Sequence, residues 1–372
     1  MKTILTILGT RPEAIKLAPV LMELEQRKNR IHSCVCVTGQ HRELLDPMLD
    51  FFGLKPDFHL HVMRPKQPLA GLTARMLAAL DPVLLEVKPD WIVIQGDTTS
   101  VLVAALSAYY RNVRVAHVES GLRTNNKYSP FPEEINRRVA GVLADAHFAP
   151  TDRAVRNLQR EGVPLNRICR SGNTVVDALN WTVRMVRKNP PSWPVYVPRP
   201  QKNQRLILVT SHRRENFGAG MEQICHALRD IAEVLPDCEL VYPVHLNPHV
   251  RGPVNRLLGG NPHIHLVQPV DYPVMVSLLN RAWLVLTDSG GLQEEAPTFH
   301  VPCIVMRETT ERPEGIRLGV AKLVGTDRRK IVGAVKHLDR NPRAYARMAM
   351  GKNPYGDGHA ARRIVDWLER HP

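Results

Sequence analysis

The sequence predicts an α/β protein with two domains, each containing a parallel β-sheet with helices on both faces. Apolar runs of strand length alternate with helix-length segments from one end of the chain to the other, as in folds of this class. The chain has 372 residues, which suits two domains of roughly 150–200 residues each. Its hydrophobic content of 44% is ordinary for a globular protein.

The first half contains four clear strand signals, and each runs into a polar turn. Strands are expected at about 2–8, 32–37, 91–94 and 113–118. Helices are expected at about 12–28, 43–52, 72–87, 100–112, 133–143 and 152–161.

The strand signal restarts in the second half, which therefore repeats the architecture. Strands are expected there at about 205–209, 239–244, 264–267, 284–286 and 303–306, with helices at about 175–187, 292–299 and 359–371, the last capped by residues 356–358. Two places could divide the domains: the segment 189–203, which is rich in proline, and the break near 171–173. Local sequence does not decide between them.

Charged residues stand at the ends of several first-half strands. Arg11 follows the first strand, Asp97 follows the strand at 91–94, and Glu119 follows the strand at 113–118. The carboxyl ends of parallel strands meet at one edge of a sheet, where ligands bind, so these side chains should converge. A guanidinium beside two carboxylates suits acid–base chemistry on an anionic substrate.

A helix start at 130–137 supplies two further acids. Prolines precede Glu133 and Glu134, and acids in a first turn complement the helix dipole. That role explains one of the two glutamates. We expect the other to face the cleft, because Arg137 lies one turn after Glu133 on the same helix face.

The turn at 287–291 is typical of a phosphate-binding site. Ser289, Gly290 and Gly291 lie between a strand and a helix, where glycines allow close approach and free N–H groups attract an anion. An ordinary strand–helix turn is the alternative. Arg312 and histidines at other strand ends favour the phosphate site; the candidates for hydrogen bonding to phosphate are His41, His117, His212 and His245. The pattern suits a nucleotide sugar, with phosphates held by the second domain and the sugar at the carboxylates of the first.

Composition and motifs argue against several other classes of protein. The net charge is +14, but the basic residues are dispersed and aromatics make up only 5%, so a solvated basic surface is favoured over nucleic-acid binding. No apolar run approaches the roughly 18 residues of a membrane span, and a cytoplasmic location is expected. Six scattered cysteines indicate buried reduced thiols, and neither a metal-binding motif nor a Walker or dinucleotide fingerprint is present.

Ten motifs in order along nearly the whole chain resemble the non-hydrolysing UDP-N-acetylglucosamine 2-epimerases. They are GTRPEAIKLAPV (9–20), TGQHRELL (38–45), GDTTS (96–100), HVESGLRT (117–124), SPFPEEINRR (129–138), GNTVVDAL (172–179), SHRRENFG (211–218), YPVHLNP (242–248), LTDSGGLQEEAP (286–297) and VMRETTERPEG (305–315). The resemblance implies a GT-B fold of two Rossmann-like, doubly wound domains with the active site in the interdomain cleft. It places the domains at 1–170 with 355–372, and at 171–354.

The resemblance also implies the reaction and its residues. The family interconverts UDP-N-acetylglucosamine and UDP-N-acetylmannosamine by anti elimination of UDP and its re-addition, for surface-polysaccharide synthesis, with no metal or redox cofactor. The implied catalytic set is Arg11, Lys16, Asp97, Glu119, Glu133, Arg137 and His212. The implied UDP-binding set is Arg11, His245, Met275, Ser289, Gly290, Gly291, Glu295 and Arg312, with Glu295 on the ribose. A homodimer with no nucleic-acid or membrane partner is expected.

Three positions depart from the family pattern. Ser120 replaces a common alanine, and Met275 stands where an aromatic often packs near the uracil. Some bacterial members bind a second substrate molecule as an activator through a segment like 40–44, which makes Gln40, His41 and Glu43 the candidate allosteric residues. Glu43 replaces a glutamine used by those members.

Two other activities remain as alternatives. A GT-B glycosyltransferase would hold UDP in the same way but would need an acceptor site. A hydrolysing epimerase would release free N-acetylmannosamine, and the motif at 9–16 argues against it by resemblance.

Overall fold

The structure is a computed structural model that describes residues 1–39, 42–64, 67–191, 193–195, 197–198 and 204–371. The chain forms two compact units. Unit 1 contains Met1–Ala178 and Tyr355–Pro372, and unit 2 contains Leu179–Pro354. The proline-rich segment 189–203 thus belongs to unit 2, and the chain passes between the units within one helix, eight residues beyond the expected 170.

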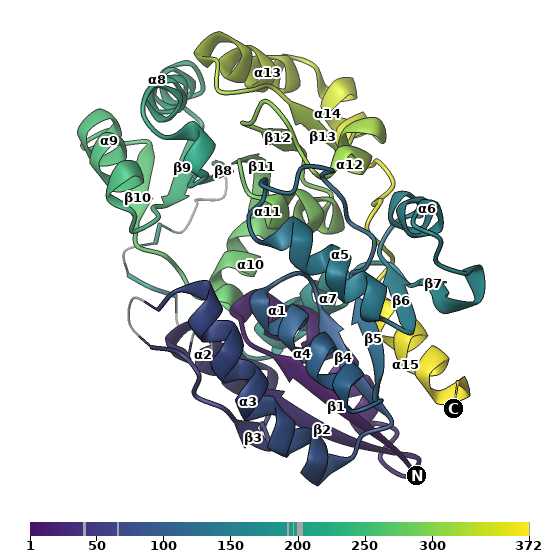
Figure 1. Cartoon of the computed structure of the whole chain (residues 1–372). Helices are drawn as coiled ribbons and strands as arrows, with labels where there is room; N and C mark the ends of the chain where they lie inside the picture. The colour runs from purple at the N-terminus through teal and green to yellow at the C-terminus, as the bar shows by residue number, and fades with distance from the viewer. Residues whose placement is uncertain (40–41, 65–66, 192, 196, 199–203, 372) are drawn as a thin grey trace. The chain divides into compact units, whose positions relative to one another are not determined.

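Unit 1 is built on a parallel sheet with strand order β3-β2-β1-β4-β5-β6-β7 (Figure 1). The strands are β1 (Lys2–Leu8), β2 (Ile31–Val37), β3 (Phe58–His59), β4 (Trp91–Gln95), β5 (Arg114–Val118), β6 (Ala146–Ala149) and β7 (Ile168–Arg170). The order reverses direction at β1 and β4, which are neighbours in the sheet. In open sheets of this kind, ligands bind beside the carboxyl ends of the strands at such a reversal.

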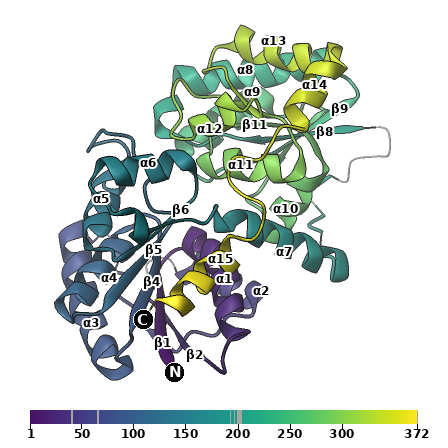
Figure 2. The ribbon, with the colours of Figure 1, turned by 90° about the vertical axis from the view of Figure 1, so that its right-hand side faces the viewer.

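Helices connect the strands of unit 1. They are α1 (Arg11–Glu25), α2 (Arg42–Phe52), α3 (Leu69–Val87), α4 (Thr99–Tyr110), α5 (Glu133–Leu143), α6 (Asp152–Arg160), α7 (Thr174–Lys188) and the C-terminal α15 (Ala360–Arg370). Figure 2 shows α15, in yellow, returning to unit 1 beside α1, which it contacts.

The start of α15 is capped by a different residue from the one expected. The carboxylate of Asp177 accepts hydrogen bonds from the backbone N–H groups of Ala360 and Ala361 at 3.2 and 3.0 Å. Asp357, in the expected capping segment, accepts from the N–H of His359 at 3.3 Å and from the Arg363 guanidinium, but from neither Ala360 nor Ala361. The cap therefore comes from α7, nearly two hundred residues away, which local sequence could not reveal.

Unit 2 repeats the design with strand order β10-β9-β8-β11-β12-β13, again entirely parallel. Its strands are β8 (Arg205–Thr210), β9 (Cys238–Pro243), β10 (Ile264–Val267), β11 (Ala282–Thr287), β12 (Cys303–Val305) and β13 (Ala321–Leu323). Its helices are α8 (Ala219–Val234), α9 (Pro248–Leu258), α10 (Tyr272–Arg281), α11 (Gly290–Glu295), α12 (Pro313–Arg317), α13 (Arg328–Arg340) and α14 (Pro342–Ala349).

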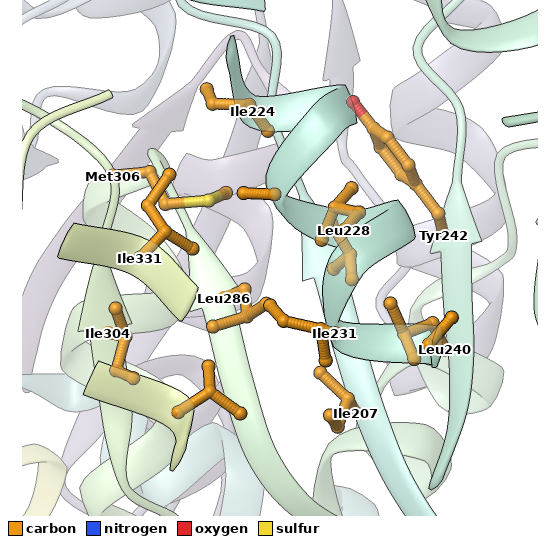
Figure 3. Packing of buried hydrophobic residues seen from close by; sticks show 14 of the residues in the cluster. Ile207, Ile224, Leu228, Ile231, Leu240, Tyr242, Leu286, Ile304, Met306 and Ile331 are labelled. Carbon is orange, nitrogen blue, oxygen red and sulfur yellow. The ribbon is translucent and has the colours of Figure 1, made fainter. Parts of the chain in front are cut away.

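Apolar side chains from the sheet and its covering helices fill the core of unit 2. Figure 3 shows Ile224, Leu228 and Ile231 of α8 facing Leu240 and other strand residues, all of them buried. Because these strands are covered on both faces, they read as continuous apolar runs in the sequence, as expected for parallel sheets.

Some elements differ from the sequence-based expectation. The short strands β3, β6, β7 and β13 were not predicted, since two to four residues give little periodic signal. The helix expected at 292–299 begins earlier, at Gly290, and ends at Glu295, where a 3₁₀ turn, Ala296–Phe299, takes over. Pro297 lacks an N–H group and cannot bond to the carbonyl of Gln293, so the α-helix does not continue.

Candidate active site

Glu119 lies directly after β5, at the carboxyl edge of the unit 1 sheet, and is held by three donors. Lys16 Nζ is 2.7 and 2.8 Å from its two carboxylate oxygens. Gln95 donates to Oε2, and Asn173 Nδ2 donates to Oε1 at 3.4 Å. The φ of Glu119 is +62°, a left-handed conformation that is rare for residues other than glycine and is often associated with function. The carboxylate is therefore fixed in place and partnered by a cation.

Asp97 lies in the neighbouring turn, after β4, and faces a different cation. Arg137 NH2 of α5 forms an ion pair with Asp97 Oδ2. Asn136 Nδ2 also donates to the Asp97 carbonyl oxygen at 2.9 Å, so α5 is tied to the turn at two points. Because β4 and β5 are paired, Asp97 and Glu119 follow adjacent strand ends, as the sequence predicts.

The two glutamates at the start of α5 have different surroundings. Glu134 is buried and accepts hydrogen bonds from the N–H groups of Thr124 and Asn125 at 3.0 and 3.1 Å. Burial alone would raise the pKa of Glu134, but these bonds and the nearby Arg137 outweigh it and hold the pKa below its usual value. Glu134 is thus the structural acid of the pair.

Glu133 was expected to share a helix face with Arg137, but Arg137 pairs with Glu134 instead, at 3.3 Å. The (i, i+3) spacing brings Glu134 to Arg137, and the same guanidinium also reaches Asp97. Glu133 Oε2 is buried and has no hydrogen-bond partner among the described residues. It is consequently a carboxylate oxygen available to another group.

The first turn of α1 contains an acid that sequence reasoning missed. Glu13 is 2% exposed, and its carboxylate accepts from Gly9 N at 2.6 Å and Thr10 Oγ1 at 2.9 Å. Burial raises the pKa of Glu13 to about 7, although hydrogen bonds from Thr98, Gly9 and Thr10 oppose the shift. Arg11, which begins α1 beside it, forms no hydrogen bond or ion pair with another described side chain. Its guanidinium is open to an anion.

His117, a phosphate-binding candidate in the sequence, is a buried structural group. Its Nε2 lies 2.7 Å from the carbonyl oxygen of Gly96, so it donates to the turn that carries Asp97. Burial, helped by the nearby Arg123 and Arg137, lowers the pKa of His117 to about 4, although the hydrogen bond to Gly96 opposes the shift. The neutral ring thus stabilises the turn that carries Asp97. Its side chain is only 1% exposed, which argues against contact with phosphate.

In unit 2, two histidines lie together at the ends of β8 and β9. The rings of His212 and His245 stack with centroids 5.4 Å apart and planes 18° apart. His245 Nδ1 accepts from the N–H of Asn247 at 3.1 Å, so its Nε2 carries the proton and can donate. Two ring donors at one strand edge suit an anionic ligand.

The turn that follows β11 lies against Arg312. A Cβ on Gly290 would be 3.1 Å from the Arg312 guanidinium carbon, so this close approach favours glycine. Arg312 Nε donates to Glu294 at 2.9 Å, and its NH1 is 3.0 Å from Glu311. Burial would raise the pKa of Glu311, but Arg312 and Arg307 outweigh it and lower that pKa to about 2. Two carboxylates therefore fix the arginine in place.

The remaining predicted UDP-binding residues of unit 2 lie at the start of α11, within α11 and on α10. Ser289 N–H donates to Thr287 Oγ1 at 2.8 Å immediately before α11. A Cβ on Gly291 would be 3.8 Å from Glu295 Oε1, which places Glu295 one turn along α11. Met275 lies in α10 and packs against the core of unit 2.

Four further features concern the allosteric candidates, the cysteines, metal-binding groups and membrane-spanning helices. The candidate allosteric residues Gln40 and His41 lie outside the described residues, as does the side chain of Glu43. All six cysteines are free, and five are buried. Among the described residues, no three or more His, Cys, Asp or Glu side chains are grouped to hold a metal ion. Across that same part of the chain, no helix is long and apolar enough to span a membrane.

The fold defines an α/β protein of two Rossmann-like domains, and the acids at the strand ends of unit 1 and the anion donors at those of unit 2 are typical of an enzyme. A sequence model of the family described as UDP-N-acetylglucosamine 2-epimerase matches residues 22–369. The UDP-N-acetylglucosamine 2-epimerase of Yersinia pestis is 51% identical over 371 residues, covering 99% of this chain and 98% of that protein. The chain belongs to the UDP-N-acetylglucosamine 2-epimerase family.

Solved structures agree with this membership. The UDP-GlcNAc 2-epimerase of Neisseria meningitidis, bound to UDP-GlcNAc, superposes with a TM-score of 0.92 at 42% identity, covering 99% of this chain and 100% of the other. That of Methanocaldococcus jannaschii, in complex with UDP-GlcNAc and UDP, has a TM-score of 0.82 at 35% identity, covering 98% and 99%. The resemblance, the class of fold and the class of enzyme predicted from the sequence are confirmed.

Proposed function

We propose that this protein epimerises carbon 2 of UDP-N-acetylglucosamine, reversibly giving UDP-N-acetylmannosamine, without hydrolysis. The mechanism is anti elimination of UDP to 2-acetamidoglucal, followed by its re-addition with a proton delivered to the opposite face of carbon 2. The single observation that carries the proposal is the group of acids at the unit 1 strand ends, where Asp97 and Glu119 each face their own cation.

The elimination follows from the chemistry of the sugar. The hydrogen on carbon 2 has no adjacent ketone to acidify it, so the diphosphate must begin to leave first and create positive charge at carbon 1. Carboxylates stabilise that charge, and one of them then removes the proton. Glu119 suits the stationary, charge-stabilising role because Lys16, Gln95 and Asn173 hold it. Asp97 and Glu133 are then the candidates for proton transfer on the two faces.

The departing diphosphate needs its own positive partners. We assign His212, His245, Ser289, Gly290 and Arg312 of unit 2 to UDP, with Glu295 on the ribose. The supporting observation is that Arg312 is fixed against the glycine turn, where a backbone N–H and a guanidinium can act on one phosphate. The assignment needs neither a metal nor a redox group, because arginine, lysine and histidine supply the compensating charge.

The setting of the enzyme also belongs to the proposal. The product would feed surface-polysaccharide synthesis, and free, mostly buried thiols support a cytoplasmic location. We further propose a homodimer. Leu85, Tyr109, Tyr110 and Val142, on the neighbouring helices α3, α4 and α5, are 49%, 60%, 66% and 85% exposed, an apolar surface that a second copy would cover.

Proton NMR in deuterium oxide with UDP-N-acetylglucosamine and no acceptor tests the reaction. An epimerase replaces the hydrogen at carbon 2 with deuterium and produces UDP-N-acetylmannosamine. Absence of exchange would indicate the rival GT-B glycosyltransferase, and free N-acetylmannosamine would indicate a hydrolysing enzyme. Replacing Asp97, Glu119 or Glu133 by its amide should each lower turnover by about 10²–10⁴; near-normal rates in all three variants would refute the site.

A further inference from the structure

Asp288 is a fully buried carboxylate at the carboxyl end of β11, surrounded by donors from the turn that follows β8. Its Oδ2 accepts from the Ser211 hydroxyl at 2.8 Å, and from the backbone N–H groups of His212 and Arg213 at 2.9 and 3.0 Å. Asn216 Nδ2 donates to the same oxygen at 2.9 Å. Four residues of one turn thus bind a single side chain of another.

A carboxylate is costly to bury unless donors satisfy its oxygens, and the donors of this turn meet that requirement for Asp288. The turn itself has further support. Tyr242 donates its hydroxyl to the Ser211 carbonyl at 2.9 Å, and Asn216 Nδ2 also lies 3.1 Å from the Met306 carbonyl. Asp288 N–H donates to the carbonyl of Thr210 at 3.1 Å. The turn therefore has a fixed position beside the strand ends.

One of the groups so fixed is the His212 ring. Its Nδ1 lies 3.7 Å from Asp288 Oδ1, an ion-pair distance that is slightly too long for a hydrogen bond. Catalytic hydrogen bonds are often long without substrate and shorten when it binds. The other side of the ring stacks on His245. The ring is therefore held between a carboxylate and an aromatic surface, with Nε2 as its other polar atom.

We propose that Asp288 is a positioning residue for His212, orienting its ring so that Nε2 donates to the leaving diphosphate. The inference rests on the proposed function, in which His212 assists departure of UDP. A carboxylate that accepts from Nδ1–H fixes the direction of the ring and stabilises its protonated form, in which Nε2 also carries a hydrogen to donate. Asp288 itself does not touch the substrate.

The charge of Asp288 also sets the protonation of the histidine. Burial lowers the pKa of His212, Asp288 opposes that shift, and Arg213 and His245 add to it. Among the described residues, the charged or titratable groups that act on the ring are Arg213 of its own turn, His245 after β9 and Asp288 after β11. Removing the carboxylate charge must therefore lower the pKa of His212 further. An enzyme that needs a protonated His212 would then lose activity at a lower pH.

The test compares Asp288→Asn, His212→Gln and the double variant by kcat and KM across pH, with Asp230→Asn as control. Asp230 belongs to an ion pair with Arg328 between helices α8 and α13 of the same unit, and neither residue is assigned to the substrate. We expect Asp288→Asn to lower kcat by about 10²-fold with less effect on KM, and to move the alkaline limb of the pH profile to lower pH. The double variant should be no slower than His212→Gln alone, because Asp288 acts through that ring.

The outcomes separate this inference from the proposed function. A wild-type rate in His212→Gln removes His212 from the reaction and overturns both its proposed role and the inference. A slow His212→Gln with an additive double variant, or with an unshifted limb in Asp288→Asn, overturns the positioning role alone. If Asp288→Asn does not fold, Ser211→Ala serves: it keeps the charge and removes one donor, so the limb should move to higher pH. A limb that stays in place or moves lower would overturn the inference.

Discussion

Glu13→Gln is the sharpest test of how the buried acids of unit 1 behave. The two oxygens of Glu13 accept from Gly9 N and Thr10 Oγ1. Glutamine has the same shape and can keep both contacts, because its oxygen accepts from the backbone N–H while the Thr10 hydroxyl rotates to accept from the amide. The substitution therefore removes the titration of Glu13 with little change in packing.

The expected magnitude follows from the pKa of Glu13, which burial raises from 4.5 to about 7. The folded protein binds this proton more tightly than the unfolded chain. The contribution to stability is therefore fully present below pH 4.5 and is lost as the pH rises to about 7. This difference in pKa between the folded and unfolded protein corresponds to about 3 kcal/mol of stability. Relative to the wild type, Glu13→Gln should match it at acid pH and become more stable by about 2–3 kcal/mol near pH 8.

Urea unfolding of both proteins at intervals between pH 4.5 and 8 measures this difference. Glu25→Gln is the matched control, because Glu25 ends the same helix with a side chain that is 70% exposed. The stability of the control should follow the wild type at every pH. Parallel curves for Glu13→Gln and the wild type would show that Glu13 ionises normally in the folded protein. The reasoning from its burial would then be wrong.

Three further substitutions probe separate contacts. Lys16→Met removes the cation that faces Glu119 and should lower kcat by about 10²-fold in steady-state assays, and an unchanged rate would refute the charge-stabilising pair. Gly290→Ala places a Cβ 3.1 Å from the Arg312 guanidinium and should weaken UDP binding about tenfold by calorimetry, whereas unchanged affinity would place UDP elsewhere. Ser120→Ala removes the hydrogen bond to His147 at 3.0 Å and should lower the unfolding free energy by about 1 kcal/mol; no loss would show that the contact contributes nothing.

The fold class could be predicted from the sequence because parallel strands covered on both faces leave a strong local record. The longer strands are mostly apolar runs, such as WIVIQ in β4 and RVAHV in β5, and Asp97 and Glu119 stand where these two runs end. The same record is missing for β3, β7 and β13, which contain only two or three residues each. Their pairing depends on neighbouring strands rather than on their own composition.

The partners of the site residues could not be predicted in the same way. Sequence spacing suggested Arg137 for Glu133, but the chain brings Arg137 to Glu134 and Asp97. Asp288 and Glu13 lie inside recognised motifs, but the sequence assigned neither of them a role. Each acquires its importance only when a turn from another strand, or a tight first turn, supplies donors to a buried carboxylate.

By itself, the sequence determined the alternation of strands and helices, the family and the identity of the acids, since these depend on local composition and ordered motifs. Only the tertiary structure decided which acids are held by cations, which are buried with shifted pKa values, and which remain open. Those properties arise from burial and from contacts between residues distant in the chain, such as Asn173 with Glu119. A carboxylate's environment is set by the whole fold, and no local pattern encodes it.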